Sequence, residues 1–324
     1  MAPLRVLLGR HGCTGGLEGD RLAGREATIE LVDEPTLIGG FRRMVREEAY
    51  DVCELALTTY LCAKAHGKRF TALPVFLVRA FHHGAVLGLP PARAAGPSAL
   101  AGARVGVRRG YTVTTGVWAR GVLDDEHGVD PSSVTWVRSG DEHVLEQQLP
   151  PNVEEVPPGH DLAGLLAAGQ LAAVIGGRYD LEGLGPLIPD PLEAGFRALA
   201  ARGHYPINHC LVVRDAILDA DPGIVADLFE AFVAAKGAYL ERLLGEASSA
   251  GEDRLYREVA SRTGADPLPY GLEANRRVLD ELVRHARRQR LLEDAPPLEA
   301  LLVPGSDRLA GGVLALPTGA SSSS

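Results

Sequence analysis

Short apolar runs alternate with longer amphipathic segments along most of the chain. In the segment 35–48, Leu37, Phe41, Met44 and Val45 recur at helical spacing and predict an amphipathic helix. The apolar runs are of strand length and are bounded by turn-forming residues. The predicted strands span residues 6–8, 28–32, 50–53, 73–78, 84–87, 104–107, 134–137, 172–175 and 210–213. This alternation is typical of a mostly parallel α/β sheet.

The strand-and-helix pattern runs through the chain in two series. A Pro-, Ala- and Gly-rich connection spans residues 90–103, and helices dominate after residue 213, chiefly over 222–244 and 273–290. We therefore expect two lobes, with residues 1–103 and 210–324 in lobe 1 and residues 104–209 in lobe 2. Ligands of open α/β sheets bind beyond the carboxyl ends of the strands. The ligand site is thus expected between the lobes, in loops that directly follow strands.

Composition narrows the class of protein. The 324 residues include 46% hydrophobic and 23% charged residues, as in ordinary globular proteins, and carry a formal net charge of −9. A nucleic-acid partner would favour a basic surface, so none is expected. We see no apolar run of membrane-span length, no secretory signal at the start and no CxxC pair among the four cysteines. These features predict a cytoplasmic protein without a membrane partner.

Polar motifs follow several of the predicted strands, and their order along the chain resembles the 4,5-dihydroxyphthalate decarboxylase family from Tyr50 to Arg276. The motifs are Tyr50–Leu55 (YDVCEL), Thr58–Tyr60 (TTY), Leu73–Phe76 (LPVF), Arg79–His82 (RAFH), Gly106–Tyr111 (GVRRGY), Thr114–Gly121 (TTGVWARG), Asp125–Val129 (DEHGV), Tyr205–His209 (YPINH) and Pro269–Arg276 (PYGLEANR).

The resemblance implies a two-lobed fold of the periplasmic-binding-protein type II class, used here as an enzyme. It also implies loss of a carboxylate from a dihydroxylated aromatic acid without an organic cofactor. Two loops depart from the family pattern, Gly9–Thr14 (GRHGCT) and Gly176–Asp180 (GGRYD). Both are expected to face the ligand, so they bear on the choice of substrate.

Decarboxylation of a hydroxybenzoate needs a proton donor at the carboxylate-bearing carbon, a base at a ring hydroxyl and a clamp for any second carboxylate. Histidine suits the proton work, and arginine matches a carboxylate with two hydrogen bonds. The predicted catalytic residues are His82, His209, Glu54 and His11. The predicted substrate-binding residues are Arg79, Thr58, Thr59, Arg108, Arg109, Tyr111, Thr114, Thr115 and Asn208.

Structural roles remain open for several of these residues. His82 could form a hydrogen bond at a chain corner, Glu54 could stabilise a helix N-terminus, and Thr114 or Thr115 could simply cap a helix. Five other histidines are expected on the surface, namely His66, His127, His143, His160 and His285.

Metal and nucleotide signatures are missing from the sequence. There is no HExxH, CxxC or DxDxDG pattern, and the Gly-rich segment 9–16 lacks both the Walker lysine and the GxGxxG spacing. We therefore expect no metal and no cofactor, and a small aromatic carboxylate as the partner; self-association stays open. Two alternatives to the decarboxylase also stay open, a solute-binding protein for an aromatic carboxylate and another lyase or dehydratase on the same fold.

Overall fold

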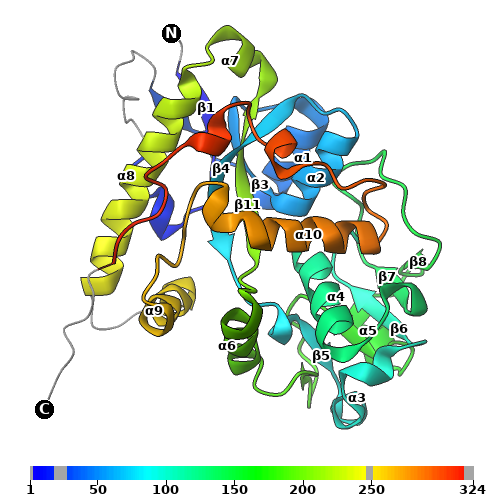
Figure 1. Cartoon of the computed structure of the whole chain (residues 1–324). Coiled ribbons are helices and arrows are strands. Elements are labelled where there is room, and N and C mark those ends of the chain that lie inside the picture. Colours follow the sequence, from blue (N-terminus) through cyan, green and yellow to red (C-terminus); the bar gives the residue numbers. More distant parts are fainter. Residues whose placement is uncertain (1–2, 18–27, 246–250, 317–324) are drawn as a thin grey trace, which may run out of the picture.

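A computed structural model describes residues 3–17, 28–245 and 251–316, which form two separate β-sheets with helices around them (Figure 1). The first sheet has the strand order β2-β1-β3-β11-β4. Strands β1, β2 and β3 are parallel, and β11 runs antiparallel to both of its neighbours. The strands of this sheet are β1 (Leu4–Leu7), β2 (Ile29–Leu31), β3 (Val52–Ala56), β4 (Phe70–Arg79) and β11 (Ile207–Arg214).

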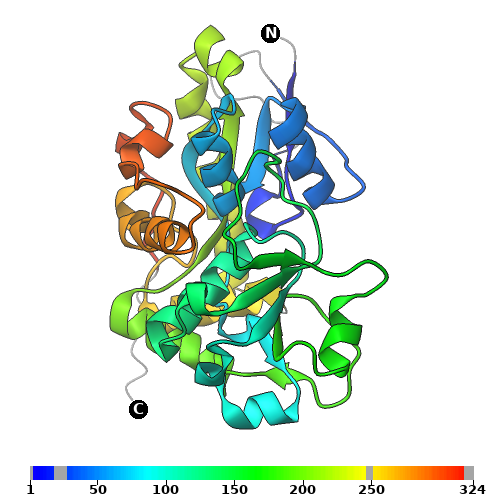
Figure 2. The same ribbon diagram turned by 90° about the vertical axis from the view of Figure 1, so that its right-hand side faces the viewer.

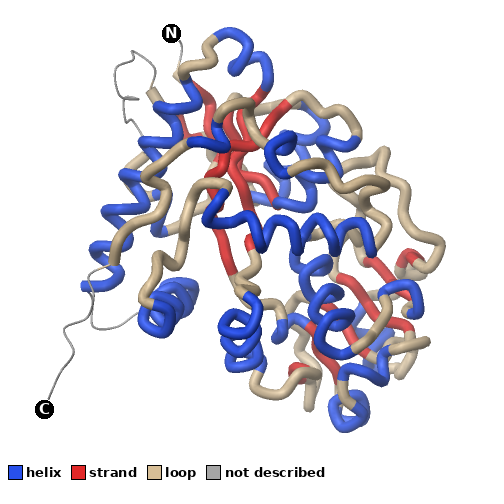
Figure 3. Tube along the Cα trace, in the orientation of Figure 1, coloured by secondary structure: helices blue, strands red, loops and turns tan. Residues whose placement is uncertain are grey.

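The second sheet has the order β10-β5-β9-β6-β7-β8, with a parallel centre and two antiparallel strands at one edge. Its strands are β5 (Val86–Gly88), β6 (Arg104–Val107), β7 (Thr135–Arg138), β8 (Val153–Glu155), β9 (Ala173–Ile175) and β10 (Gly185–Pro186). The two groups of strands are apart in Figure 3, and the view turned by 90° in Figure 2 shows the same separation.

The chain passes between the sheets twice. It leaves the first sheet at the end of β4 and returns to it through β11. Helix α10 packs against α4, which follows β6 of the second sheet, so the C-terminal region also joins the two halves (Figure 1). The helices are α1 (Leu37–Glu47), α2 (Leu57–Ala65), α3 (Pro90–Ala95), α4 (Thr114–His127), α5 (Leu162–Ala167), α6 (Pro191–Arg202), α7 (Asp215–Ala220), α8 (Ile224–Gly245), α9 (Gly251–Thr263) and α10 (Arg276–Arg288).

One hydrophobic cluster reaches from the first sheet into the second. It includes Cys53 and Phe76 of the first sheet together with Val105 and Trp136 of the second. Side chains of this cluster connect the two sheets through one contiguous core.

Several elements differ from the sequence expectations. Strand β5 lies within the range expected for lobe 1, yet it pairs with β9 and β10 of the second sheet. The expected connection 90–103 contains α3, and β8 was not among the predicted strands. None of the helices in the described part of the chain is long and apolar enough to cross a membrane.

Candidate active site

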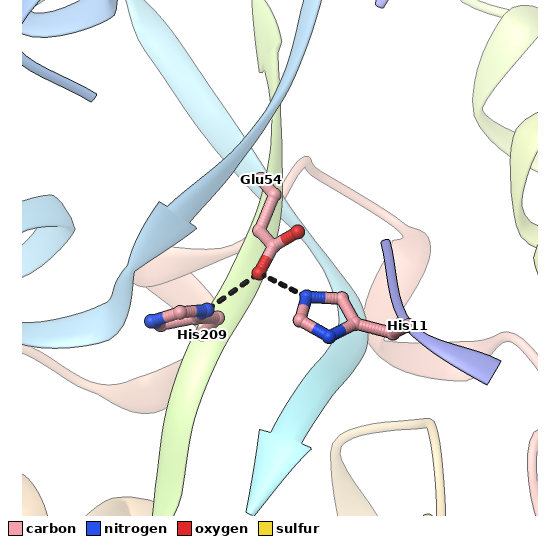
Figure 4. Close-up of side chains that lie close together, drawn as sticks. All are labelled: His11, Glu54 and His209. Carbon is pink, nitrogen blue, oxygen red and sulfur yellow. Dashed lines mark hydrogen bonds and ion pairs between the residues drawn. The ribbon is translucent and has the colours of Figure 1, made fainter. Parts of the chain in front are cut away.

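A buried carboxylate, Glu54, lies at the centre of a three-residue cluster (Figure 4). Glu54 belongs to β3, whose five residues are all buried, and its side chain has no exposed surface. One carboxylate oxygen, Oε2, accepts a hydrogen bond from the backbone N–H of Gly9 at 2.6 Å. The other oxygen, Oε1, contacts two imidazoles, those of His11 and His209. Three groups therefore hold this carboxylate in one orientation.

His209 reaches Glu54 from the neighbouring strand β11. The strands pair so that Leu211 lies opposite Glu54 and His209 opposite Ala56, which makes His209 and Glu54 diagonal neighbours on one face of the sheet. His209 Nδ1 lies 2.5 Å from Glu54 Oε1, and 21% of the His209 side chain is exposed. Because Nδ1 is turned to the carboxylate, Nε2 is the nitrogen left for a ligand (Figure 4).

His11 completes the cluster from the loop that follows β1. Its Nε2 lies 2.8 Å from the same Oε1, and its Nδ1 lies 3.8 Å from the carboxylate of Glu252 on α9. This approach depends on Gly9, because a Cβ at that position would lie 2.3 Å from His11 Nε2. The Gly-rich loop after β1 thus brings a histidine onto Glu54.

Electrostatics favour an ionised Glu54 beside charged imidazole. Burial alone would raise the pKa of Glu54, but the hydrogen bonds from His11 and His209 and their positive charges hold it well below its usual range. Burial likewise opposes a charged His11, but the hydrogen bond to Glu54 and the charges of Glu54 and Glu252 outweigh it and raise the pKa of His11. The cluster is therefore built to keep a carboxylate ionised and to hold a proton on imidazole.

The same three side chains could also bind a metal ion. His11, Glu54 and His209 each offer one ligand atom, and these atoms lie within 4.8 Å of one another, a donor set that suits divalent transition metals. Both imidazoles meet a single carboxylate oxygen at hydrogen-bond distance, however, which is the arrangement of a shared proton relay.

A second candidate region lies at the carboxyl ends of β6 and β9. Arg108 and Arg109 follow β6 and line a cavity of about 90 Å³ together with Thr115 at the start of α4 and the backbone of Gly176 and Gly177. Neither guanidinium has a carboxylate within 4.0 Å among the residues that the structure describes. Helix α4 begins without a side-chain cap, so its first N–H groups are also free to bind an anion.

The predicted threonine ligands have different environments. Thr58 and Thr114 are buried against each other, with their hydroxyl oxygens 2.8 Å apart, and the Thr58 hydroxyl donates to the carbonyl of Thr112. They join the starts of α2 and α4 and do not face a ligand in this structure. Thr59 is buried as well, and its hydroxyl lies 3.0 Å from Nδ1 of His143. Of the four predicted threonine ligands, Thr115 alone lines the cavity beside the arginines.

Arg79 and Tyr111 are also buried and have structural partners. The Arg79 guanidinium donates to the carbonyl of Tyr205 and to the side chain of Asn275, and it lies over the Tyr205 ring. Tyr111 packs against the Arg120 guanidinium, which lies 3.8 Å from the centre of its ring. The expectation that Arg79 clamps the substrate is wrong for this structure, because its NH1 and NH2 groups are occupied by protein atoms.

His82 and Asn208 meet where the chain passes between the sheets. His82 Nε2 lies 2.8 Å from Asn208 Oδ1, and this contact ties the segment after β4 to β11. Burial lowers the pKa of His82 to about 4, although the hydrogen bond with Asn208 opposes the shift. His82 is therefore neutral at pH 7, and no hydrogen bond joins it to the Glu54 cluster within the described residues. The structural alternative considered for His82 fits its position.

Two histidines expected on the surface are in fact buried, His143 and His285. His285 lies between α4 and α10, near Asp125 and Glu281. His143 lies in the loop after β7 and contacts Thr59 of the first half. His143 follows a predicted strand, which is a favourable position for a ligand-binding residue. Its polar neighbours in the sequence nevertheless led to the prediction of an exposed loop.

Two curated relatives share sequence with the chain over long stretches. A 4,5-dihydroxyphthalate decarboxylase from Comamonas testosteroni is 32% identical over 286 residues, which cover 82% of the chain and 86% of that protein. A 4,5-dihydroxyphthalate decarboxylase from Pseudomonas putida is 40% identical over 158 residues, which cover 46% of the chain and 60% of that protein. No family model matches the chain.

Solved structures share the fold at low sequence identity. The periplasmic aliphatic sulphonate binding protein SsuA from Escherichia coli has a TM-score of 0.52 at 12% identity and aligns over 93% of the chain and 92% of its own length. A Candida albicans protein described as having the generic periplasmic binding protein fold gives 0.52 at 13% identity, with coverages of 91% and 92%. The desulfurization enzyme DSZB gives 0.52 at 14% identity, with coverages of 94% and 97%. These likenesses confirm the periplasmic-binding-protein-like fold.

The 32% identity to the Comamonas testosteroni enzyme extends over most of both proteins. The chain therefore belongs to the 4,5-dihydroxyphthalate decarboxylase family, a family of carboxy-lyases.

Proposed function

We propose that this protein removes a carboxylate as CO2 from a hydroxylated aromatic acid of the 4,5-dihydroxyphthalate type, by protonating the ring carbon that bears the carboxylate. The substrate class follows from the two relatives, both of which are named for that decarboxylation. The mechanism rests on the cluster of His11, Glu54 and His209. The family relationship supports decarboxylation as the reaction, and the geometry of this cluster supports ring protonation as its mechanism.

His209 is the proposed proton donor. Its Nδ1–H donates to the ionised Glu54, so a protonated His209 presents Nε2–H away from the carboxylate, toward a ligand. The exposed fifth of its side chain allows a small molecule to reach that nitrogen. His11, on the same Glu54 oxygen, keeps a second proton close to the relay. A carboxylate that fixes one tautomer of a histidine is a recurring device of acid–base catalysis.

Arg108 and Arg109 are proposed to hold a carboxylate of the substrate. The two guanidinium groups, which have no carboxylate partner within residues 3–17, 28–245 and 251–316, surround one cavity together with Thr115 and the start of α4. An anion there is favoured both by the arginine charge and by the helix dipole. With one carboxylate held in this way, the other is left without a matching charge and is easier to lose.

The proposed step balances in atoms and electrons. The His209 Nε2–H proton forms a C–H bond at the carboxylate-bearing carbon, and a ring hydroxyl supplies electron density to that carbon. The bond from the ring to the carboxylate then breaks, its electron pair returns to the ring, and CO2 leaves. His209 recovers a proton from water, so one proton is consumed for each CO2 released.

We further infer that each sheet organises one lobe and that the passages between β4 and β5 and between α6 and β11 serve as the hinges. The free, buried state of all four cysteines fits a reducing cytoplasm, the location we infer for the enzyme.

The observation that carries the proposal is the buried Glu54 carboxylate held against two imidazoles. Incubating the protein with 4,5-dihydroxyphthalate and measuring released CO2 tests it. Turnover that is lost in His209→Ala supports the proposal. Tight binding of the acid without any CO2 release would instead favour a solute-binding protein.

A further inference from the structure

The loop after β7 carries a second imidazole close to the proposed proton donor. His143 packs edge-on against the Phe41 ring, with centroids 6.4 Å apart, and His209 packs edge-on against the same ring at 5.3 Å. Phe41 lies on α1 of the first half, whereas His143 comes from the second half. The two imidazoles therefore contact the same ring, one from each half of the molecule.

One nitrogen of His143 is anchored and the other is not. Nδ1 lies 3.0 Å from the hydroxyl of Thr59, on α2. Only 5% of His143 is exposed, and its Nε2 is buried without a hydrogen-bond partner among the residues that the structure describes. An orphaned buried nitrogen is costly, and such groups in native proteins call for a ligand or water as partner. Thr59 thus holds the ring so that Nε2 remains available.

Positive charge surrounds this histidine. Burial and the charges of Arg42, Arg109 and Arg46 together lower the pKa of His143 to about 4, against the opposing charge of Asp141. His143 is consequently a neutral imidazole at pH 7. In the tautomer whose Nδ1–H donates to the Thr59 hydroxyl, Nε2 carries a lone pair and can accept a hydrogen bond. Nearby arginines would also stabilise negative charge on the group that donates to it.

Access to Nε2 depends on the loop that carries it. Asp141 in this loop pairs with Arg42 and Arg46 of α1 at 2.6 and 2.7 Å, and Arg46 also donates to the carbonyls of Glu142 and His143. Half of the Asp141 side chain is exposed, and ion pairs of that kind are weak in water. A ligand would reach Nε2 only where these ion pairs open and the loop moves away from α1.

We propose that His143 is a further catalytic residue, which accepts a hydrogen bond at Nε2 from a ring hydroxyl of the substrate while His209 protonates the ring. The inference rests on the proposed decarboxylation and adds recognition of the hydroxyl group to it. A hydrogen bond from the hydroxyl to His143 pushes electron density into the ring, which is what protonation of the ring carbon requires. The histidine pair would thus polarise one substrate from two sides.

Comparing a hydroxylated with a non-hydroxylated ligand tests this role. His143→Asn keeps a polar group near the Nδ1 position, so the Thr59 contact can persist, and removes Nε2. We expect kcat/KM for 4,5-dihydroxyphthalate to fall about 10- to 100-fold, the loss of one buried hydrogen bond with its acceptor. The inhibition constant of phthalate, which lacks the hydroxyls, should change less than threefold. Thr59→Val should give a smaller loss with the same preference, and the exposed His66→Asn should match the wild type.

Equal losses for both ligands would mean that His143 only supports the fold, and no loss for either would remove it from the site; both results overturn the inference. Should the wild type bind 4,5-dihydroxyphthalate without turnover, the proposed function fails, and dissociation constants for the two ligands then decide the role of His143 separately. If His143→Asn does not fold, the ratio measured with Thr59→Val decides it.

Discussion

Replacing Glu54 by glutamine removes the charge on which the proposed relay depends and leaves the side-chain shape unchanged. In the wild type, Glu54 accepts hydrogen bonds from the imidazoles of His11 and His209 and from the N–H of Gly9. A hydrogen bond to a charged group contributes about 1.5–3 kcal/mol, and 1.4 kcal/mol corresponds to a factor of ten in rate. In Glu54→Gln, His209 loses the hydrogen bond to a charged carboxylate and the group that fixes its tautomer. We therefore expect kcat to fall by about 10²- to 10³-fold.

The assay is steady-state CO2 release from 4,5-dihydroxyphthalate at pH 7, with KM and thermal unfolding measured on the same preparations. KM should change little, because Glu54 is fully buried and cannot touch the substrate. Glu252→Gln is the matched control, since its carboxylate lies 3.8 Å from His11 and is half exposed, and it should cost no more than about threefold. A Glu54→Gln enzyme with more than a third of wild-type kcat would refute the relay.

Three further predictions follow from other parts of the structure. Arg109→Ala and Arg108→Ala should each raise KM about tenfold and leave kcat within threefold. Steady-state kinetics measures both constants, with the exposed Arg287→Ala as the control. An unchanged KM would mean that these arginines do not bind the substrate carboxylate. The pKa of Glu126 is lowered to about 2, because hydrogen bonds from His83 and Arg202 outweigh its burial, so its contribution to stability is present above pH 4.5 and is lost as the pH falls toward 2. Urea unfolding of the wild type should therefore lose about 1 kcal/mol more than Glu126→Gln between pH 6 and pH 3.5, and equal losses would contradict the shift. Dialysis against a chelator should leave at least half of the activity, and a loss restored by added divalent metal would place a metal ion in the Glu54 cluster.

The hydrophobic pattern predicted most of the elements that position the site. The strand over 104–107 matches the structure, whereas β3 (Val52–Ala56) extends beyond the predicted strand 50–53, so Glu54 lies within the strand and not after it. Periodicity works there because one face of each element is buried in a common core. Short edge strands such as β8 and β10 were not predicted, because two or three residues are too few to show a periodic pattern.

The sequence also named three residues that the structure brings together, His11, Glu54 and His209, although it could not show that they share one oxygen. That contact depends on strand register, which places His209 diagonally across from Glu54. Arg79 shows the opposite case, because a family motif and a favourable chain position did not reveal that its guanidinium is turned to Tyr205 and Asn275. Side-chain direction at a chain crossing is set by tertiary packing, which local pattern does not encode.

A single comparison tests most directly whether His209 delivers the proton. His209→Ala is mixed with 4,5-dihydroxyphthalate, and bound ligand and released CO2 are measured in the same sample as for the wild type. We expect ligand affinity within about threefold of wild type and CO2 release reduced at least about 10²-fold, the usual contribution of a positioned acid. Release of CO2 at the wild-type rate by the alanine variant would contradict the account.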